Sequence, residues 1–336
     1  MAIDRISNLS DDIISTKILP LMETKEAVQT CVLSRAWRVL WNDINILSFD
    51  RYSYSFKPKK SDAFRNFIYH VLCNRQPSEV RCLKFYCRGF ESYPSDIINS
   101  VFNYATSHKI REIETDVVIF PKSLLESQTL ETLKVAYGRY SKLENPLGFK
   151  FLKTLQLSEV SLWKGSDFFS NCKNLEDLEL TNCRVCNLKT NPKTFCIKAP
   201  SLVNLTVKNL EHRDGIFTKS LERLHVSSPR LKYFEIDGLQ PYLPDVLDVY
   251  ECEALEEVKF NMCNPLVSQG NSDPEWKIEY IDLMKWIAES FPHAKCLTIS
   301  LDFHWGKFIL HRVGLTGEVT LKEIYKECNF KNSLWS

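Results

Sequence analysis

The chain has 336 residues, of which 44% are hydrophobic, so it can form two ordinary domains or one elongated repeat array with a large core. Its 43 Lys and Arg residues nearly balance 42 Asp and Glu residues, and the formal net charge is +1. So small a charge excludes strong long-range attraction to polyanions, and we expect neither a nucleic-acid partner nor a membrane partner.

The first residues, MAIDRISNLSDDII, are polar and acidic where a secretory signal would be basic and then apolar. No apolar stretch reaches the roughly 18 residues that a membrane helix needs. We therefore expect a soluble protein of the cytoplasm and/or nucleus. The twelve cysteines lie mostly within apolar segments such as VRCLKFYC, which predicts reduced and buried thiols.

Residues 1–48 predict three short helices. Ser10 is a candidate N-cap for the first, Thr24 for the second and Ser34 for the third, which would carry Trp37 and Leu40 on one face with Trp41. A unit of this size leaves part of its apolar surface exposed, which favours partner binding through that surface. A polar link and a capping helix with apolar positions 64, 67, 68 and 71 are expected over residues 49–79.

From Val80 a pattern of the form L-x-x-L-x-L returns along the chain. Its successive first positions from Leu130 are 22, 23, 27, 29 and 24 residues apart, which is the period of leucine-rich repeats. The copies occupy the positions 130/133/135, 152/155/157, 175/178/180, 202/205/207, 231/234/236 and 255/258/260, with looser copies at 80/83/85 and 294/297/299. We predict repeats over residues 80–310, a C-terminal tail over 311–336, and an open arc whose parallel strands line the concave side.

A second periodicity accompanies the first. The segments FCIKAPSLVNLTV, residues 195–207, and LHVSSPRLKYFEI, residues 224–236, superpose at an offset of 29 residues. Each predicts an extra short strand, a turn containing Pro200 or Pro229, and then the main strand, because proline cannot donate to a ladder. Helical connectors are expected after Pro94 and around residues 283–291.

Cys183 and Cys186 form a C-x-x-C motif flanked by Cys172 and Cys196, so a zinc site is one interpretation. The repeat register favours another, because Cys183 occupies the ninth repeat position, where an Asn or Cys closes the turn; Cys263 holds the same place. We therefore expect no metal and no cofactor. An enzyme is not favoured either, since no nucleophile elbow, phosphate loop or H-E-x-x-H motif occurs, although a site near Cys172–Cys196 stays open as an alternative.

The stretches DRISNLSDDII and TKEAVQTCVLSRAWRVLW resemble an F-box across residues 4 to 41, and the repeats resemble those of plant F-box/leucine-rich-repeat proteins of the F-box/FBD/LRR group. This resemblance implies an α/β fold with a three-helix F-box at residues 1–48 and a leucine-rich-repeat solenoid. It also implies a non-catalytic substrate receptor of an Skp-cullin-F-box ubiquitin ligase, which docks on the Skp-type adaptor and through it on a cullin. The family's adaptor-facing positions fall on Leu9, Ile13, Ile14, Ile18, Leu19, Val32, Leu33, Trp37 and Leu40.

Four features depart from the family pattern: Ser10 replaces the usual proline, one extra residue precedes Thr24, Pro20 must break or bend the first helix, and Ala36 replaces a basic residue. They keep open an alternative function, a repeat scaffold for protein interactions whose divergent F-box is not coupled to a ligase.

In either case strand alternation directs polar side chains to the concave face. The candidate target-binding residues are Lys134, Gln156, Asp177, Glu179, Lys208, Tyr233, Glu235 and Lys259, a mixture of charges that suits a protein target.

Overall fold

The fold is described from a computed structural model of the chain. The described residues are 9–35, 37–54, 59–75, 80–87, 95–136, 142–144, 146–163, 167–186, 194–214, 217–219, 223–237, 247–250, 252–262, 291, 294–301 and 319–321. Within them, no helix has the length and apolar character required to cross a membrane.

Three helical segments form a module at the N-terminal end. They consist of α1 (Asp11–Ile13), η1 (Ile14–Ile18) and η2 (Leu19–Leu21), then α2 (Thr24–Gln29) and η3 (Thr30–Val32), then α3 (Trp37–Leu40) and η4 (Trp41–Asp43). The predicted caps at Ser10 and Ser34 are confirmed, since their hydroxyls accept hydrogen bonds from the N–H groups of Ile13 and Trp37. Thr24 begins the second helix, but Glu23 holds its N-cap position.

The first helical segment changes type twice. A π-helical turn, η1, follows α1, and Pro20 then lies in the 3₁₀ turn η2. A π turn holds one residue more than an α turn, so it accommodates the extra residue that the sequence places before Thr24. Pro20 has no backbone N–H to donate, and this costs no hydrogen bond because the N–H groups in the first turn of a helix have no acceptor within that helix. The predicted break near Pro20 is confirmed, and its π geometry is an additional finding.

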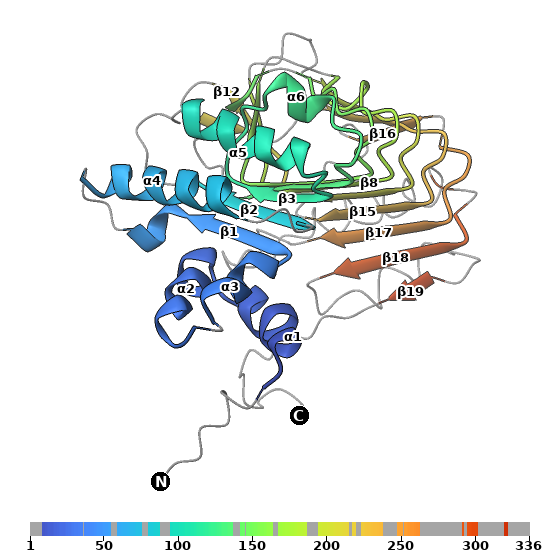
Figure 1. The fold of residues 1–336 in the computed structure, drawn as a ribbon. Helices are drawn as coiled ribbons and strands as arrows, with labels where there is room; N and C mark the ends of the chain where they lie inside the picture. Colours follow the sequence, from blue (N-terminus) through green and yellow to red (C-terminus); the bar gives the residue numbers. More distant parts are fainter. Residues whose placement is uncertain are drawn as a thin grey trace, which may run out of the picture.

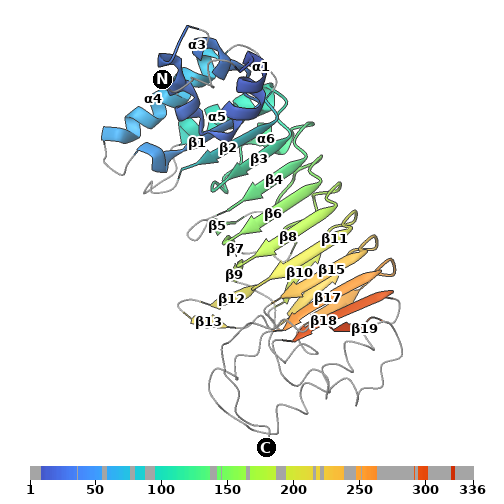
Figure 2. The same cartoon turned by 90° about the horizontal axis from the view of Figure 1, so that it is seen from below.

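An 11-stranded parallel sheet forms the main layer, with strands in chain order from one end to the other. Figures 1 and 2 show them stacked successively from the N-terminal helices to β19. The strands are β1 (Ile46–Asp50), β2 (Cys82–Tyr86), β3 (Glu112–Thr115), β4 (Thr132–Val135), β6 (Thr154–Ser158), β8 (Asp177–Thr181), β11 (Asn204–Lys208), β15 (Tyr233–Asp237), β17 (Glu257–Met262), β18 (Cys296–Leu301) and β19 (Val319–Leu321). Each predicted repeat supplies one of these strands, so the repeat prediction is confirmed.

Helices and shorter strands cover the opposite side. The helices are η5 (Arg51–Tyr54), α4 (Lys59–Asn74), α5 (Ser95–Ser107) and α6 (Lys122–Leu125). A three-stranded sheet contains β10 (Thr194–Lys198), β14 (Arg223–Ser227) and β16 (Leu247–Tyr250), and a five-stranded sheet contains β5 (Lys142–Leu143), β7 (Ser161–Trp163), β9 (Arg184–Cys186), β12 (Glu211–Asp214) and β13 (Phe217–Lys219). The pairing of Ile197 with Val226 confirms the extra strand before each proline turn.

One continuous apolar core runs from Ile14 to Phe291. The predicted helix stripes contribute to it: Phe64, Ile68 and Val71 of α4 are fully buried, and α5 buries its apolar face from residue 97 to residue 105. Of the connector expected around residues 283–291, only Phe291 lies within the described residues, where it is buried. The helical module and the repeats therefore share a single core.

The sheet begins earlier than the sequence analysis placed it. β1 lies across the expected boundary between residues 48 and 49, and β2 is the second strand rather than the first. The reason is hydrophobic burial, because Ile44, Leu47 and Phe49 all point into the core at the spacing of a repeat.

Candidate functional site

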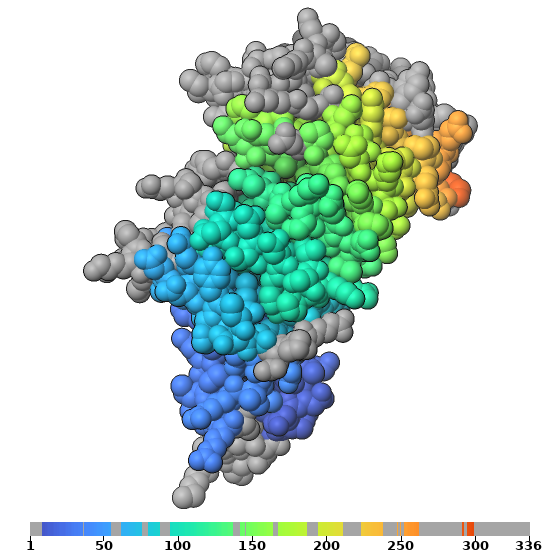
Figure 3. Space-filling view, turned by 45° about the horizontal axis from the view of Figure 1, so that its top comes forward, coloured from blue at the N-terminus to red at the C-terminus, as the bar shows by residue number. Residues whose placement is uncertain are grey.

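Large apolar side chains are exposed on the helical module. Val32 and Leu33 are 88% and 63% exposed at the end of η3, and Leu21, Val39 and Ile13 are 86%, 60% and 42% exposed. Figure 3 shows the module as the dark-blue end of the molecule, next to α4. Isolated exposed apolar residues are common on protein surfaces, but five within one short module make that module a candidate for protein binding.

The structure divides the nine expected adaptor-facing residues into three groups. Ile13, Val32 and Leu33 are exposed, and Leu9 and Ile18 are partly buried against the core. The remaining four are buried in this chain: Ile14, Leu19, Trp37 and Leu40. Trp37 and Trp41 share one face as predicted, but that face packs inward, so the tryptophans stabilise the module from inside.

Sequence reasoning did not select Leu21 and Val39 for this surface. Val39 lies between Trp37 and Trp41 but off their helical stripe, and Leu21 follows the proline break. The usable signal was their position: an aliphatic residue opposite a buried stripe faces water.

Polar side chains cover the open face of the large sheet. Its strands have alternating partly exposed and buried residues, which confirms the predicted alternation. Parallel pairing places like positions of successive repeats side by side, so that Lys134, Gln156, Glu179, Thr206, Glu235 and Lys259 form one row across the sheet. All eight candidate target-binding residues are partly exposed on this face.

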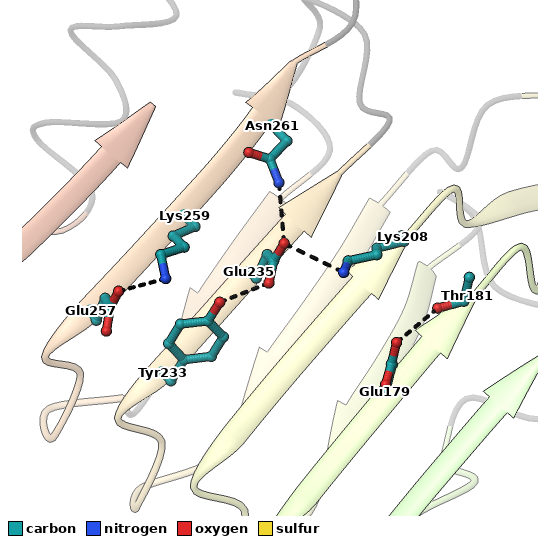
Figure 4. Close-up of polar contacts among 8 residues, drawn as sticks. All are labelled: Glu179, Thr181, Lys208, Tyr233, Glu235, Glu257, Lys259 and Asn261. Atoms are coloured by element: carbon teal, nitrogen blue, oxygen red, sulfur yellow. Dashed lines mark hydrogen bonds and ion pairs between the residues drawn. The ribbon is translucent and has the colours of Figure 1, made fainter. Parts of the chain in front are cut away.

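Glu235 is the most connected of them (Figure 4). Its carboxylate accepts hydrogen bonds from Tyr233 Oη at 2.7 Å and Asn261 Nδ2 at 3.1 Å, and Lys208 Nζ lies 3.6 Å from it. Burial, followed by the hydrogen bond to Glu235, raises the pKa of Tyr233 to about 12. The network therefore holds a neutral phenol beside a carboxylate at neutral pH.

Lys259 and Lys134 are also paired within the face. Lys259 Nζ lies 2.8 Å from Glu257 Oε1 and 4.9 Å from the ring centroid of Tyr233, and the hydrogen bond that it donates to Glu257 raises the pKa of Lys259. Lys134 Nζ lies 2.8 Å from Glu112 Oε1, and that hydrogen bond raises the pKa of Lys134. Both lysines remain charged at neutral pH and are locally neutralised.

Three carboxylates of the same face have no cationic partner among the described residues. Asp177 accepts hydrogen bonds from Thr154 at 3.2 Å and from Asn204 at 2.5 Å, and Glu179 accepts one from Thr181 at 3.3 Å. Asp237 ends β15 and is partly exposed, without an ion pair within the described part of the chain. Strands β8 to β17 therefore present more acidic than basic charge to the open side.

Two of the central cysteines, Cys172 and Cys183, lie in the apolar core of the repeats. Cys183 is fully buried, its Sγ lies 3.3 Å from the carbonyl oxygen of Leu157, and burial raises its pKa to about 11. Cys172 is buried with a pKa of about 11 for the same reason. A zinc ligand or a redox thiol needs the thiolate, which burial disfavours here. Cys263 lies outside the described residues.

Comparison with curated proteins identifies the relatives of this chain. An Arabidopsis thaliana protein named F-box/LRR-repeat protein is 28% identical over 247 residues, which cover 70% of this chain and 76% of that protein. An FBD-associated F-box protein of the same plant is 31% identical over 70% of this chain and 55% of its own length. The chain is a homologue of the plant F-box/LRR proteins. No family model matches it.

A third relative, another Arabidopsis FBD-associated F-box protein, is 27% identical over 326 residues, or 92% of this chain. About 27 residues at most lie outside this match, so it includes the repeats and at least the later part of the helical module. The chain spans 55% of the length of the second relative and 70% of the length of the third. Features of the longer relatives outside the matched part do not carry over to it.

Proposed function

We propose that this F-box/LRR homologue is the substrate-recognition subunit of an Skp-cullin-F-box ubiquitin ligase. The observation that carries the proposal is the exposure of Val32 and Leu33, two large aliphatic side chains that lie within the match to a named F-box protein. Burying such side chains against a partner contributes roughly 25 cal/mol per Å² of apolar area. The Skp-type adaptor is the proposed partner, and a cullin would join through the adaptor.

Within this proposal the nine adaptor-facing positions have two roles. Ile13, Val32 and Leu33 contact the adaptor directly, together with the exposed Leu21 and Val39. The other positions, Leu9, Ile14, Ile18, Leu19, Trp37 and Leu40, hold the helices that present the contact residues, because they pack against or inside the core.

The open face of the large sheet is the proposed target-binding site. The residues proposed to contact a target are Lys134, Gln156, Asp177, Glu179, Lys208, Tyr233, Glu235 and Lys259. The unpaired carboxylates support a protein target with basic side chains at the contact, because opposite charges across an interface favour association and select partners. The chain would perform no bond chemistry itself; it would raise the effective concentration of target lysines near the ubiquitin carrier.

Co-purification of the full chain with the Skp-type adaptor tests the proposal. We expect the wild type to bind, and the double variant Val32→Asp/Leu33→Asp to lose at least about 30-fold in affinity, because two desolvated anchors are replaced by charges. Lys173→Glu, at an exposed position before β8, is the control and should bind as the wild type does.

The same experiment decides between the ligase receptor and the protein-interaction scaffold. A folded wild type that fails to bind the adaptor would rule out the receptor and leave the scaffold. Equal binding by the wild type and the double variant would contradict the assigned surface.

A further inference from the structure

The first strand of the large sheet has one edge without a neighbouring strand in the described part of the chain. There β1 is the terminal strand in the sheet order and pairs with β2 alone. An uncovered strand edge presents free N–H and C=O groups and invites pairing with another chain. In this molecule the helical module lies next to β1 (Figures 1 and 2), so the edge faces the start of α2.

Thr24 makes the direct connection to that edge. Its Oγ1 accepts a hydrogen bond from the backbone N–H of Ser48, in the middle of β1, over 2.7 Å. Thr24 is 0% exposed, so the bond is shielded from water. A buried N–H that lost this partner would carry the full cost of an unsatisfied donor. The hydroxyl of Thr24 therefore substitutes for a neighbouring strand.

Lys25 makes a second connection one residue later. Its Nζ donates a hydrogen bond to the carbonyl oxygen of Ser53 over 2.7 Å and lies 4.3 Å from the ring centroid of Tyr54. That ring packs against Phe64 and Phe67 of α4 at centroid distances of 5.2 and 5.7 Å. Lys25 thus attaches α2 to the turn that follows β1 and, through Tyr54, to the first helix of the arc.

Two further contacts join the same parts from either side. The Ser53 hydroxyl donates a hydrogen bond to the Glu23 carboxylate, and the guanidinium of Arg75, at the end of α4, donates one to the carbonyl oxygen of Ile44. Arg75 is buried, and Ile44 is the last residue before the turn into β1. Residues from three consecutive positions of one module, 23 to 25, therefore all contact the segment from 48 to 54.

We infer that Thr24 and Lys25 are positioning residues that fix the direction of the repeat arc relative to the helical module. They belong to the TKEAV element that carries the F-box resemblance, yet both contact this chain's own first repeat. Under the proposed function, on which this consequence rests, they set where a target held on the open face lies relative to the adaptor. The joint, by which we mean the contacts of Thr24 and Lys25 with residues 48–54, needs no partner to form.

Hydrogen exchange of the full chain tests the joint without any partner. In Thr24→Val, which keeps the shape and removes the acceptor, we expect amides of residues 46–50 to exchange at least about tenfold faster, while those of β6 keep the wild-type rate. Thr24→Ser should restore protection. Thr30→Val is the matched control, because its hydroxyl donates to the carbonyl oxygen of Ala27 within the same module. Wild-type exchange in Thr24→Val would overturn the inference.

Small-angle scattering and ubiquitin mapping test its consequence. The double variant Thr24→Val/Lys25→Met should show a broader distribution of molecular dimensions than the wild type, with the helical content of both proteins equal. Reconstituted with adaptor, cullin and charged carrier, it should bind the adaptor within about twofold of the wild type but receive ubiquitin on a wider set of arc lysines. Unchanged dimensions and an unchanged lysine set would reject a positioning role.

The two proposals fail in different ways. If the wild type does not bind the adaptor, the ligase function fails, while exchange and scattering still decide whether Thr24 and Lys25 fix the arc. If adaptor binding is intact but exchange is unaltered in Thr24→Val, the positioning role fails alone.

Discussion

The side-chain amide of Asn209 donates a hydrogen bond to the side-chain oxygen of Asn182, one repeat earlier, over 3.0 Å. Both residues have a positive φ, 51° and 52°, directly after strands β11 and β8, and Glu159 after β6 has a φ of 58°. The backbone N–H of Asn182 and that of Asn209 each donate to the next strand's terminal carbonyl. A left-handed residue therefore ends each of these strands and turns the chain away from the sheet.

Replacement of Asn182 separates the backbone effect from the side-chain effect. Asn182→Gly keeps the left-handed backbone accessible and loses one hydrogen bond, so we expect a loss of about 0.5–1.5 kcal/mol in the free energy of unfolding. Asn182→Ala adds the strain of a left-handed residue and should lose about 1–2 kcal/mol more. Urea unfolding measures both, and equal losses would argue against backbone strain at this turn.

Trp37 and Val32 should respond differently to truncation. Trp37 is buried among the helices, so Trp37→Ala should destabilise the chain by about 3–5 kcal/mol. Val32 is exposed, and Val32→Ala should change stability by no more than about 0.5 kcal/mol while weakening adaptor binding. Thermal unfolding beside an adaptor titration checks both, and Trp37→Phe should recover most of the lost stability. A destabilised Val32→Ala would contradict the assigned roles.

The stability should fall at alkaline pH because of the buried thiols. Burial raises the pKa of Cys183 to about 11, whereas a thiol of the unfolded chain titrates near about 8.5. Between these values the unfolded state loses a proton that the folded state keeps, so unfolding becomes easier by up to about 1.4 kcal/mol per pH unit and thiol. Below about pH 8.5 the thiol is protonated in both the folded and the unfolded state, so the free energy of unfolding keeps its full value there.

Urea unfolding at several pH values from 8 to 10.5 measures that slope. Cys183→Ala should reduce it, and Cys172→Ala should reduce it by a similar amount, since burial raises that pKa to about 11 as well. Ser170→Ala removes a nearby polar atom without a titrating group and should retain the wild-type slope. A Cys183→Ala variant with the wild-type slope would show that this thiol ionises in the folded chain.

The open sheet face should lose its target when its unpaired acids are reversed. We expect Glu179→Lys/Asp237→Lys to recover a crosslinked target several-fold less than the wild type, with stability changed by about 0.5 kcal/mol or less per site. The difference should shrink at high salt, because exposed charges are screened. Lys173→Glu on the turn before β8 is the control. Undiminished recovery by the charge-reversed variant would exclude this part of the face.

The strands of the repeats could be predicted because the residues at the L-x-x-L-x-L positions are the ones that the strands bury. Leu175, Leu178 and Leu180 occupy the three buried positions of their repeat, and a parallel ladder admits only that register. Three strands of the large sheet were missed. Two had the spacing, with Ile44, Leu47 and Phe49 at β1 and Ile110, Ile113 and Thr115 at β3. The third, β19, lies in the segment that was expected to be a C-terminal tail. At β3 the third position of the pattern is Thr115, a polar residue, whose hydroxyl donates a hydrogen bond to the carbonyl oxygen of Phe85.

The module's surface could be predicted only in part. An apolar stripe on a short helix can face a core or a partner, and composition is the same in both cases. Trp37 and Leu40 proved to be core residues, while Val32 and Leu33 are exposed. The polar joint of Thr24 with Ser48 could not be predicted at all, because it depends on which strand lies at the edge, and that is decided by tertiary packing.

Because the helical module covers the edge of β1, the first strand of the sheet has a fixed position relative to that module. Since parallel strands are spaced by about 4.8 Å, the distance from the helices to any repeat is set by how many strands lie between them. Insertion or loss of one whole repeat between β6 and β8 would leave the helical module and the local surface of every other repeat intact, yet shift everything beyond it by one strand width. Repeat number is thus a means of adjusting reach in steps of a few ångströms, independently of what either end recognises.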